Sequence, residues 1–195
     1  IVDYFVRDLK ILYEEKEHHN LVFLGKDKDG IVRYATKRGT ADIYGKKYRG
    51  DVAGNDKNYG INIVNEKSTE LKVFEANIDL MSYMDIKGDF ESNKLVLGMT
   101  ADNPLVQFLK DHPHIKKITF CMDNDEAGML AMFGNEEKAG LLKKYEMQGY
   151  ETDTDTVPQG IGCKDWNEYL IYKKNGQDIG RTEPIENHQV EYSRK

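Results

Sequence analysis

Strand-like and helix-like segments alternate through the second part of the sequence, and this alternation most limits the folds open to the chain. Short apolar runs rich in β-forming residues predict strands at 71–74, 95–98 and 118–122. Helical spacing of apolar residues predicts helices at 78–84, 104–110 and about 127–147. A further strand is expected at 150–157 and a last short helix at 166–172. Alternation at this pace is typical of βαβ units, so we expect an α/β fold around a parallel sheet.

The first part of the chain has a different pattern. Residues 2–13 carry apolar side chains near helical spacing, which predicts a short helix. Two β-forming runs, 21–24 and 31–35, flank the segment Asp27-Lys28-Asp29-Gly30, and an Asp-Gly turn between such runs indicates a hairpin. Residues 38–60 have no firm period, and we expect loops and short strands there.

Charge is distributed unevenly along the sequence. The net charge of −6 argues against a general nucleic-acid binder, and residues 71–195 alone carry −7. Residues 26–57, however, hold nine Lys and Arg against five Asp and Glu. Such a chain can hold phosphates on one surface and metal ions on another, although ordinary charge scatter is an open alternative. We expect a small basic α+β module at 1–69, an α/β domain at 70–172 and a polar, flexible tail at 173–195.

Several classes of protein are disfavoured by the sequence. No apolar run approaches the roughly 18 residues of a membrane span, and no secretory signal is visible at the start. Cys121 and Cys163 are too few for a disulfide scaffold or a structural zinc site. The pairs His18-His19 and His112/His114 lack further partners at ligand spacing, so we expect surface residues. We therefore expect a soluble cytoplasmic protein with no membrane partner.

Carboxylates directly follow two of the predicted strands. Glu75 follows the run ending at Phe74, and Asp123 and Asp125 follow the run ending at Met122. Adjacent parallel strands would bring Glu75 close to the two aspartates, which point the same way in extended backbone. Converging carboxylates repel one another, and a hard cation such as Mg²⁺ relieves the repulsion. The pattern points to Mg²⁺-dependent phosphoryl or nucleotidyl transfer.

Two other acidic motifs fit the same residues poorly. An EF-hand would need ligands at Ala127 and Gly134, and neither residue has an oxygen-bearing side chain. A haloacid-type phosphatase usually has Thr or Val where this chain has Ala127. Two alternatives stay open at this point: a glycosyltransferase Asp-X-Asp motif, and simple capping of the next helix by Asp123 and Asp125.

The surroundings of these carboxylates resemble the TOPRIM domains of bacterial primases. Residues 73–79 (VFEANID) resemble the first signature, Glu-Gly-X-X-Asp, with Ala76 in place of Gly. Residues 120–128 (FCMDNDEAG) resemble the second, a hydrophobic strand running into Asp-X-Asp-X-Ala-Gly. Residues 97–100 (LGMT) are similar to a Leu-Gly-Thr element, and 164–170 (KDWNEYL) to an Asp-Pro-Asp-Glu-Tyr-Leu segment.

The resemblance covers about residues 20–170 and is looser before residue 70. It implies a Rossmann-like TOPRIM core with a parallel sheet, preceded by a small α+β module, as in TOPRIM-like proteins of mobile elements. The implied function is primase-like, Mg²⁺-dependent nucleotidyl transfer in DNA replication or mobile-element transfer. Single-stranded DNA and nucleoside triphosphates are the implied partners, with replication or conjugation proteins beside them.

The resemblance also implies residue roles. Glu75 would act as general acid/base or share a metal, Asp79 would support the site, and Asp165 would help a second metal position. Asp123 and Asp125 would bind Mg²⁺ or Mn²⁺. Three cations would face the template or the triphosphate and contact its phosphates: Arg38, Lys47 and Lys57. Because Ala76 replaces Gly, we expect the backbone to approach a phosphate less closely.

Three other activities are compatible with the same residues. A TOPRIM-type nuclease would use the site in the hydrolytic direction. A non-catalytic accessory module would use the scaffold only to bind nucleic acid. A metal-dependent glycosyl- or phosphotransferase would act on small molecules instead.

Overall fold

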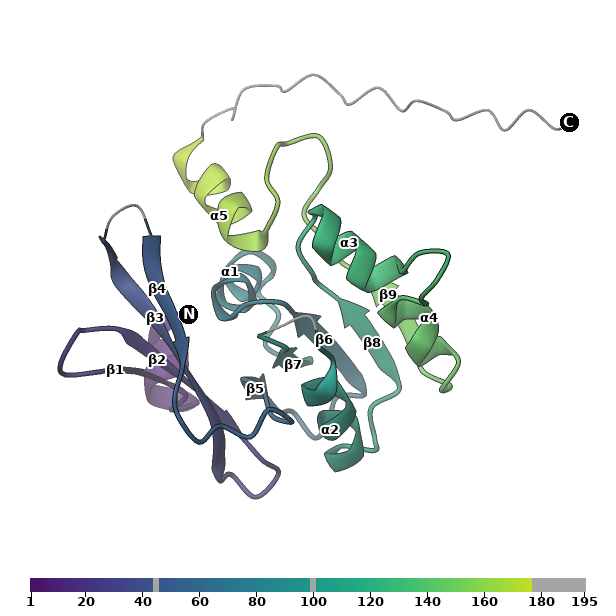
Figure 1. Ribbon diagram of the computed structural model, residues 1–195, viewed down its shortest axis with the longest axis horizontal. Helices are drawn as coiled ribbons and strands as arrows, with labels where there is room; N and C mark the ends of the chain where they lie inside the picture. The colour runs from purple at the N-terminus through teal and green to yellow at the C-terminus, as the bar shows by residue number, and fades with distance from the viewer. Residues whose placement is uncertain (44–45, 99–100, 177–195) are drawn as a thin grey trace, which may run out of the picture.

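Two β-sheets form the framework of the protein (Figure 1). The structure, a computed structural model, describes residues 1–43, 46–98 and 101–176. The first sheet is antiparallel, has the order β1-β2-β3-β4 and follows a short π-helical turn, η1 (Tyr4–Asp8). Its strands are β1 (Leu12–Glu14), β2 (Leu21–Lys26), β3 (Val32–Ile43) and β4 (Lys46–Asp51).

The second sheet has five strands in the order β5-β7-β6-β8-β9. The strands β7, β6, β8 and β9 are parallel, and β5 pairs with the edge of β7 in the antiparallel sense. Their bounds are β5 (Asn62–Ile63), β6 (Glu70–Phe74), β7 (Asn93–Val96), β8 (Lys117–Phe120) and β9 (Glu151–Thr154). The α/β class predicted from the sequence is therefore confirmed, with a parallel sheet preceded by a small antiparallel one.

Helices cover both faces of the parallel sheet (Figure 1). One face packs against α1 (Asn77–Lys87) and α5 (Trp166–Asn175). The other packs against α2 (Asn103–Asp111), α3 (Glu126–Phe133) and α4 (Leu141–Glu146). Within the described residues, none of the helices is long and apolar enough to cross a membrane.

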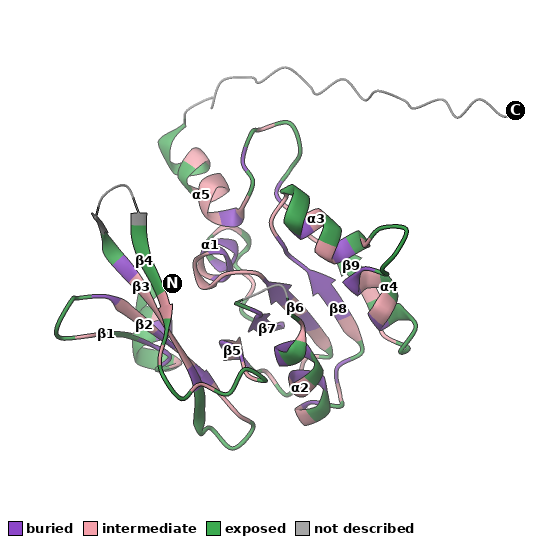
Figure 2. Cartoon of the chain, in the orientation of Figure 1, coloured by how far each residue is buried: buried purple, intermediate pink, exposed green. Residues whose placement is uncertain are grey.

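One hydrophobic core joins the two sheets. Phe23 of β2 and Leu12 of β1 belong to the same buried cluster as Phe74 of β6, Val96 of β7 and Trp166 of α5. Buried side chains concentrate in β6, β7 and β8, while β1 and β4 are largely exposed (Figure 2). The antiparallel sheet thus shares its interior with the α1 side of the parallel sheet.

The junction between the sheets depends on a close approach of three backbone segments. A Cβ on Gly25 would lie 2.3 Å from the carbonyl oxygen of Gly60, and a Cβ on Gly60 would lie 2.1 Å from that of Val96. The Asn62 side chain adds a hydrogen bond of 2.7 Å to the Lys26 carbonyl. Only residues without a side chain allow this contact, so both glycines serve packing between the sheets.

The predicted helix at 2–13 is wrong in its second half. The helical turn ends at Asp8, and Lys10 has φ 52°, a left-handed conformation that stops a helix. The chain then enters β1, where Leu12 pairs with Phe23. Pairing with a neighbouring strand outweighs the helical spacing because both Ile11 and Leu12 are buried there.

Residues 38–60 contain more strand than the sequence indicated. The strands β3 and β4 form a long hairpin in which Arg38 pairs with Arg49, with an irregular register between Arg38 and Asp42. Much of β4 faces solvent, so its polar residues give no alternating pattern from which the strand could be predicted.

The helix expected at about 127–147 is two helices. Gly134 ends α3 with φ +74°, and a Cβ there would lie 2.2 Å from the Lys138 carbonyl oxygen. A bridge between Gly134 and Ala139 closes this tight connection, and α4 begins at Leu141. Helix α5 continues to Asn175, three residues beyond the end of the predicted helix at 172. Of the tail predicted for 173–195, residues 177–195 lie outside the described part.

We predict that Gly60→Ala lowers the free energy of unfolding by about 2–3 kcal/mol, because the added methyl group forces the sheets apart. Urea unfolding followed by the fluorescence of Trp166, the single tryptophan, measures the loss. Gly54→Ala is the control: its Cβ meets nothing within 4 Å, and its φ of +86° should cost only about 1 kcal/mol. Equal losses in the two variants would contradict the packing role of Gly60.

Candidate active site

Acidic residues gather at the carboxyl ends of β6 and β8. The chain leaves β6 toward β7 on one side, whereas β8 lies on the other side of β6. Loops diverge at such a switch point and leave a crevice where ligands of α/β proteins bind. Glu75 directly follows β6 and Asp123 lies just beyond β8, so both flank this crevice.

Local structure fixes the second acidic segment. Asp125 caps α3 by accepting a hydrogen bond of 2.9 Å from the backbone N–H of Gly128. A Cβ on Gly128 would lie 2.1 Å from the carbonyl oxygen of Asp123. The glycine of the Asp-X-Asp-X-Ala-Gly pattern is therefore required because α3 begins directly against the Asp123 backbone.

A third segment joins the site from the start of α5. Asp165 caps this helix through a 2.7 Å hydrogen bond from the Glu168 N–H. The Asn124 N–H donates to the Lys164 carbonyl at 2.6 Å, which links the α5 segment to the end of β8. Asp79, buried in the first turn of α1, accepts a 3.1 Å hydrogen bond from the Asn167 N–H. These contacts connect all three acidic segments.

Burial and neighbouring negative charges raise the pKa values of three of these carboxylates. Burial and then the charges of Asp79 and Glu75, followed by those of Asp165 and Asp125, raise the pKa of Asp123 to about 7. Burial and the neighbouring Asp165 raise the pKa of Asp79 to about 6. Burial and Asp125 also raise the pKa of Glu75. Negative charge is thus crowded at this edge of the sheet.

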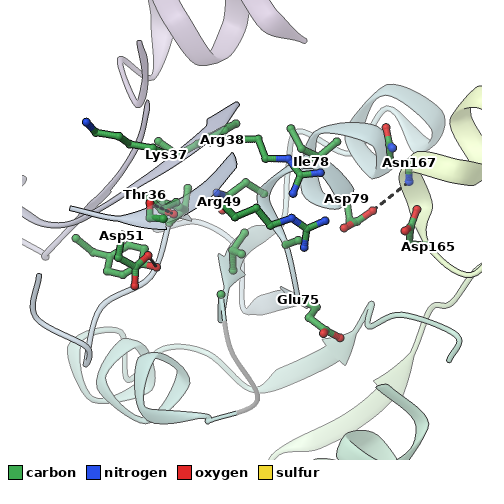
Figure 3. Close-up of a pocket in the computed structure, with 18 residues that line it drawn as sticks. Thr36, Lys37, Arg38, Arg49, Asp51, Glu75, Ile78, Asp79, Asp165 and Asn167 are labelled. Atoms are coloured by element: carbon green, nitrogen blue, oxygen red, sulfur yellow. Dashed lines mark hydrogen bonds between the residues drawn. The ribbon is translucent and has the colours of Figure 1, made fainter. Parts of the chain in front are cut away.

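Two arginines from the antiparallel sheet lie opposite the acidic residues. Arg38 and its cross-strand partner Arg49 line a cavity of about 340 Å³ together with Glu75, Asp79 and Asp165. Figure 3 shows both guanidinium groups directed toward the side that carries Asp79 and Glu75. Burial and the adjacent Arg49 lower the pKa of Arg38, while Asp79 and Asp165 oppose that shift. The cavity therefore has a cationic wall and an anionic wall.

The amino end of α1 forms part of the same cavity. Ala76, Asn77 and Ile78 line it, and among the described residues the N-cap Ala76 provides no side-chain hydrogen bond to the N–H groups of this first turn. Ala76 has φ −130° and ψ 157°, an extended conformation open to any residue. Replacing the usual Gly by Ala therefore causes no backbone strain, and the free N–H groups remain suited to an anion.

The other two predicted cations lie elsewhere. Lys57 pairs with Asp51 and lies 5.7 Å from the centre of the Tyr34 ring. Lys47 is exposed and lines a separate cavity with Tyr48. Of the three cations expected to face a ligand, only Arg38 reaches the acidic cavity. In the Leu-Gly-Thr-like element, Met99 and Thr100 lie outside the described residues.

Comparison with known proteins decides the family. Residues 72–170 match the family described as Toprim-like, and residues 1–67 match one described as Protein of unknown function (DUF3991). The chain belongs to the Toprim-like family. An uncharacterized Bacillus anthracis protein, pXO2-78, is 29% identical over 177 residues, which span 82% of this chain and 49% of that protein. The chain thus spans about half the length of its curated relative.

Solved primase structures share the fold of this Toprim-like protein. The primase fragment of the bacteriophage T7 primase-helicase superposes with a TM-score of 0.56 at 16% identity, covering 85% of this chain and 62% of that one. The E. coli primase catalytic core has a TM-score of 0.53 at 18% identity, with 86% and 54% covered. A DnaG primase catalytic domain bound to ssDNA has a TM-score of 0.53 at 16% identity, with 88% and 54% covered. The resemblance read from the sequence is therefore confirmed at the level of family and fold.

The donor set of the Toprim-like site fits Mg²⁺. Within the part of the chain that the structure describes, no Lys or Arg forms an ion pair with Glu75, Asp79, Asp123 or Asp125. No three of these carboxylates bring oxygens within 4.8 Å of one another among the described residues. Mg²⁺ needs only one or two carboxylates because it keeps several waters, so this looser arrangement suits it.

Arg49 and a histidine cluster were not identified as site residues from the sequence. Arg49 pairs with Arg38 across a hairpin, and the signal that could have found it was the register of that hairpin. The expectation that His112 and His114 are surface residues is wrong for His112, which is buried and has its pKa lowered by that burial. Both rings face Glu66, 46 and 48 residues earlier in the chain. No spacing rule connects residues so far apart.

We predict that Asp123→Asn stabilises the metal-free Toprim-like protein at pH 8 but hardly at pH 4. The pKa of Asp123 lies at about 7 in the folded protein and near 3.8 when the chain is unfolded, so folding loses stability as pH rises between these values. Removing the charge should raise the free energy of unfolding by about 1–2 kcal/mol at pH 8 and by only a few tenths of a kcal/mol at pH 4. The gain at pH 8 is smaller than the full pKa shift implies because the site is partly solvated.

Urea unfolding in EDTA at the two pH values measures this difference. Glu146→Gln, on the exposed surface of α4, is the matched control and should leave the free energy of unfolding unchanged at both pH values. Equal destabilisation by Asp123→Asn at both pH values would show that the side chain is needed for folding rather than strained by its charge.

Proposed function

We propose that this protein carries out Mg²⁺-dependent, primase-like nucleotidyl transfer on single-stranded DNA. The observation behind the proposal is the pairing of charges in one cavity, where Glu75, Asp79 and Asp165 face Arg38 and Arg49. Asp123 lies close enough to these three carboxylates for their charges to raise its pKa. A nucleoside triphosphate with its divalent ion fits such a cavity, because its phosphates can bind the cationic wall while the ion binds the anionic wall.

Carboxylates of the anionic wall and the two aspartates beside it would hold the metal. Asp123 and Asp125 follow β8 and provide hard oxygen ligands, with Asp165 and Asp79 close enough to influence the pKa of Asp123. Mg²⁺, or Mn²⁺ in its place, would supply neutralisation of charge on the transferring phosphate. The pKa values of Asp123 and Asp79, raised by burial and then by neighbouring carboxylates, support this assignment, since a bound dication relieves the repulsion between these charges.

The cationic wall would hold the phosphates. Arg38 and Arg49 can each form two parallel hydrogen bonds to phosphate oxygens. The uncapped N–H groups at the start of α1 add a partial positive charge at the same cavity. These groups would orient a triphosphate between the two sheets.

Glu75 would act as the base. Burial and Asp125 raise its pKa, which makes the carboxylate a better proton acceptor. The 3′-hydroxyl oxygen of a primer attacks the α-phosphorus while its proton moves to Glu75. The bond between the α- and β-phosphates breaks, and pyrophosphate leaves. The same residues could direct water at a phosphodiester, and product lengths distinguish synthesis from cutting.

We predict that Glu75→Gln and Asp123→Ala each reduce product formation at least about 100-fold, since each removes a group that acts on the reacting atoms. The assay uses labelled single-stranded DNA with NTPs or dNTPs and Mg²⁺ or Mn²⁺. Glu146→Gln is the control and should retain full activity. Retained DNA binding without products in the unsubstituted protein would indicate an accessory module instead, and shortened substrate would indicate a nuclease.

We further predict that Arg38→Ala and Arg49→Ala each weaken nucleotide binding about tenfold, whereas Lys47→Ala changes it less than twofold. The two arginines line the acidic cavity and Lys47 does not. Fluorescence anisotropy with a labelled triphosphate and Mg²⁺ measures the affinities. An equal loss in all three variants would mean that general positive charge, rather than this cavity, attracts the nucleotide.

A further inference from the structure

A second group of potential metal ligands lies at the opposite end of the parallel sheet. Glu66 belongs to the loop that precedes β6, and His112 and His114 belong to the loop that precedes β8. The backbone N–H groups of Lys116 and Lys117 donate to the Thr69 carbonyl at 2.8 and 3.1 Å. These bonds hold the two loops together at the amino ends of the strands, whereas Glu75 and Asp123 follow the carboxyl ends.

The separations in this group fit metal ligands better than hydrogen bonds. His112 Nδ1 lies 3.4 Å from Glu66 Oε1, and His114 Nδ1 lies 3.5 Å from Glu66 Oε2. Hydrogen bonds between N–H and O are usually shorter, at about 2.7–3.2 Å. Two ligands on a tetrahedral Zn²⁺, each about 2.0–2.1 Å from the ion, are about 3.3–3.4 Å apart. One ligand atom from each of the three residues lies within 4.8 Å of the others.

The histidines are held in place before any ion binds. The His112 side chain is only 6% exposed, and its ring lies 4.4 Å from that of Phe108. Its backbone N–H ends α2 by donating to the Phe108 carbonyl at 2.9 Å. His114 directs Nδ1 toward Glu66, while its Nε2 is buried without a hydrogen-bond partner among the described residues. Glu66 is 70% exposed and can adjust its carboxylate to the ion.

We propose that Glu66, His112 and His114 form a binding site for a transition-metal dication such as Zn²⁺. Two imidazoles and one carboxylate suit such an ion, whereas Mg²⁺ prefers oxygen ligands alone. Three protein ligands leave a coordination position open to water. The site is separate from the acidic cavity and does not depend on the proposed nucleotidyl transfer. A bound ion would link the loops before β6 and β8.

Metal binding by tag-free, EDTA-treated protein tests this proposal. Zn²⁺ titration by calorimetry should give one equivalent, and Co²⁺ should give the visible absorption of a low-coordinate site containing nitrogen ligands. Zn²⁺ at a hundredfold excess over Kd should raise Tm by about 5–10 °C. Glu66→Gln should weaken Zn²⁺ binding at least about tenfold and His114→Asn about 100-fold. Both changes keep the buried His112 ring and alter only more exposed side chains, so both variants should fold and melt like the parent in EDTA.

Two controls separate this site from the others. His18→Asn alters an exposed histidine beside Glu15 and should leave Zn²⁺ affinity unchanged. Asp123→Asn removes a carboxylate that lies beside the acidic cavity, just beyond β8, and should also leave the Zn²⁺ affinity unchanged. Loss of Zn²⁺ binding in Asp123→Asn, undiminished affinity in His114→Asn, or no binding by the unsubstituted protein would each overturn the proposal.

Discussion

Mutual repulsion of carboxylates at the ends of β6 and β8 is the constraint on which the candidate site depends. Burial and neighbouring charges raise the pKa of Asp123 to about 7 and that of Asp79 to about 6. Folding must hold these charges together against their repulsion, and the buried strands beneath them supply the necessary stability. Helix caps at Asp125 and Asp165 and the backbone bond to Asp79 prevent the side chains from moving apart. Such an arrangement is suited to a cation.

The opposing charge comes from a different part of the chain. Arg38 and Arg49 lie on the antiparallel sheet, and the acidic residues lie at the edge of the parallel one. Neither sheet alone makes the cavity. Its two walls are aligned by the backbone contact of Gly60 with Gly25 and Val96 and by the core that the sheets share. Residues matching two separately described families therefore contribute to one site.

The sequence was sufficient for the parts of the structure that depend on local signals. Strand-forming runs predicted β6, β7 and β8, and the carboxylates after them predicted the acidic edge, because both signals lie within a few residues. Arg49 required the pairing of β3 with β4, which polar strands facing solvent do not reveal. The Glu66 and His112 contact required the three-dimensional fold, since the loops meet only through strand order. Functional residues that directly follow strands could therefore be predicted from the sequence, whereas residues brought together from distant loops could not.

The shared core also limits how the protein can select its ligand. Phe23 of β2 and Phe74 of β6 lie in one continuous interior, so rotating one sheet away from the other would expose large apolar side chains to water. Hinge-like opening between the two walls is therefore energetically disfavoured. The cavity behaves as a gap of fixed width, and the range of ligands it admits is set by the side chains on its walls. Variation among relatives at Arg38, Arg49 or Ala76 would retune selectivity without any change in the framework.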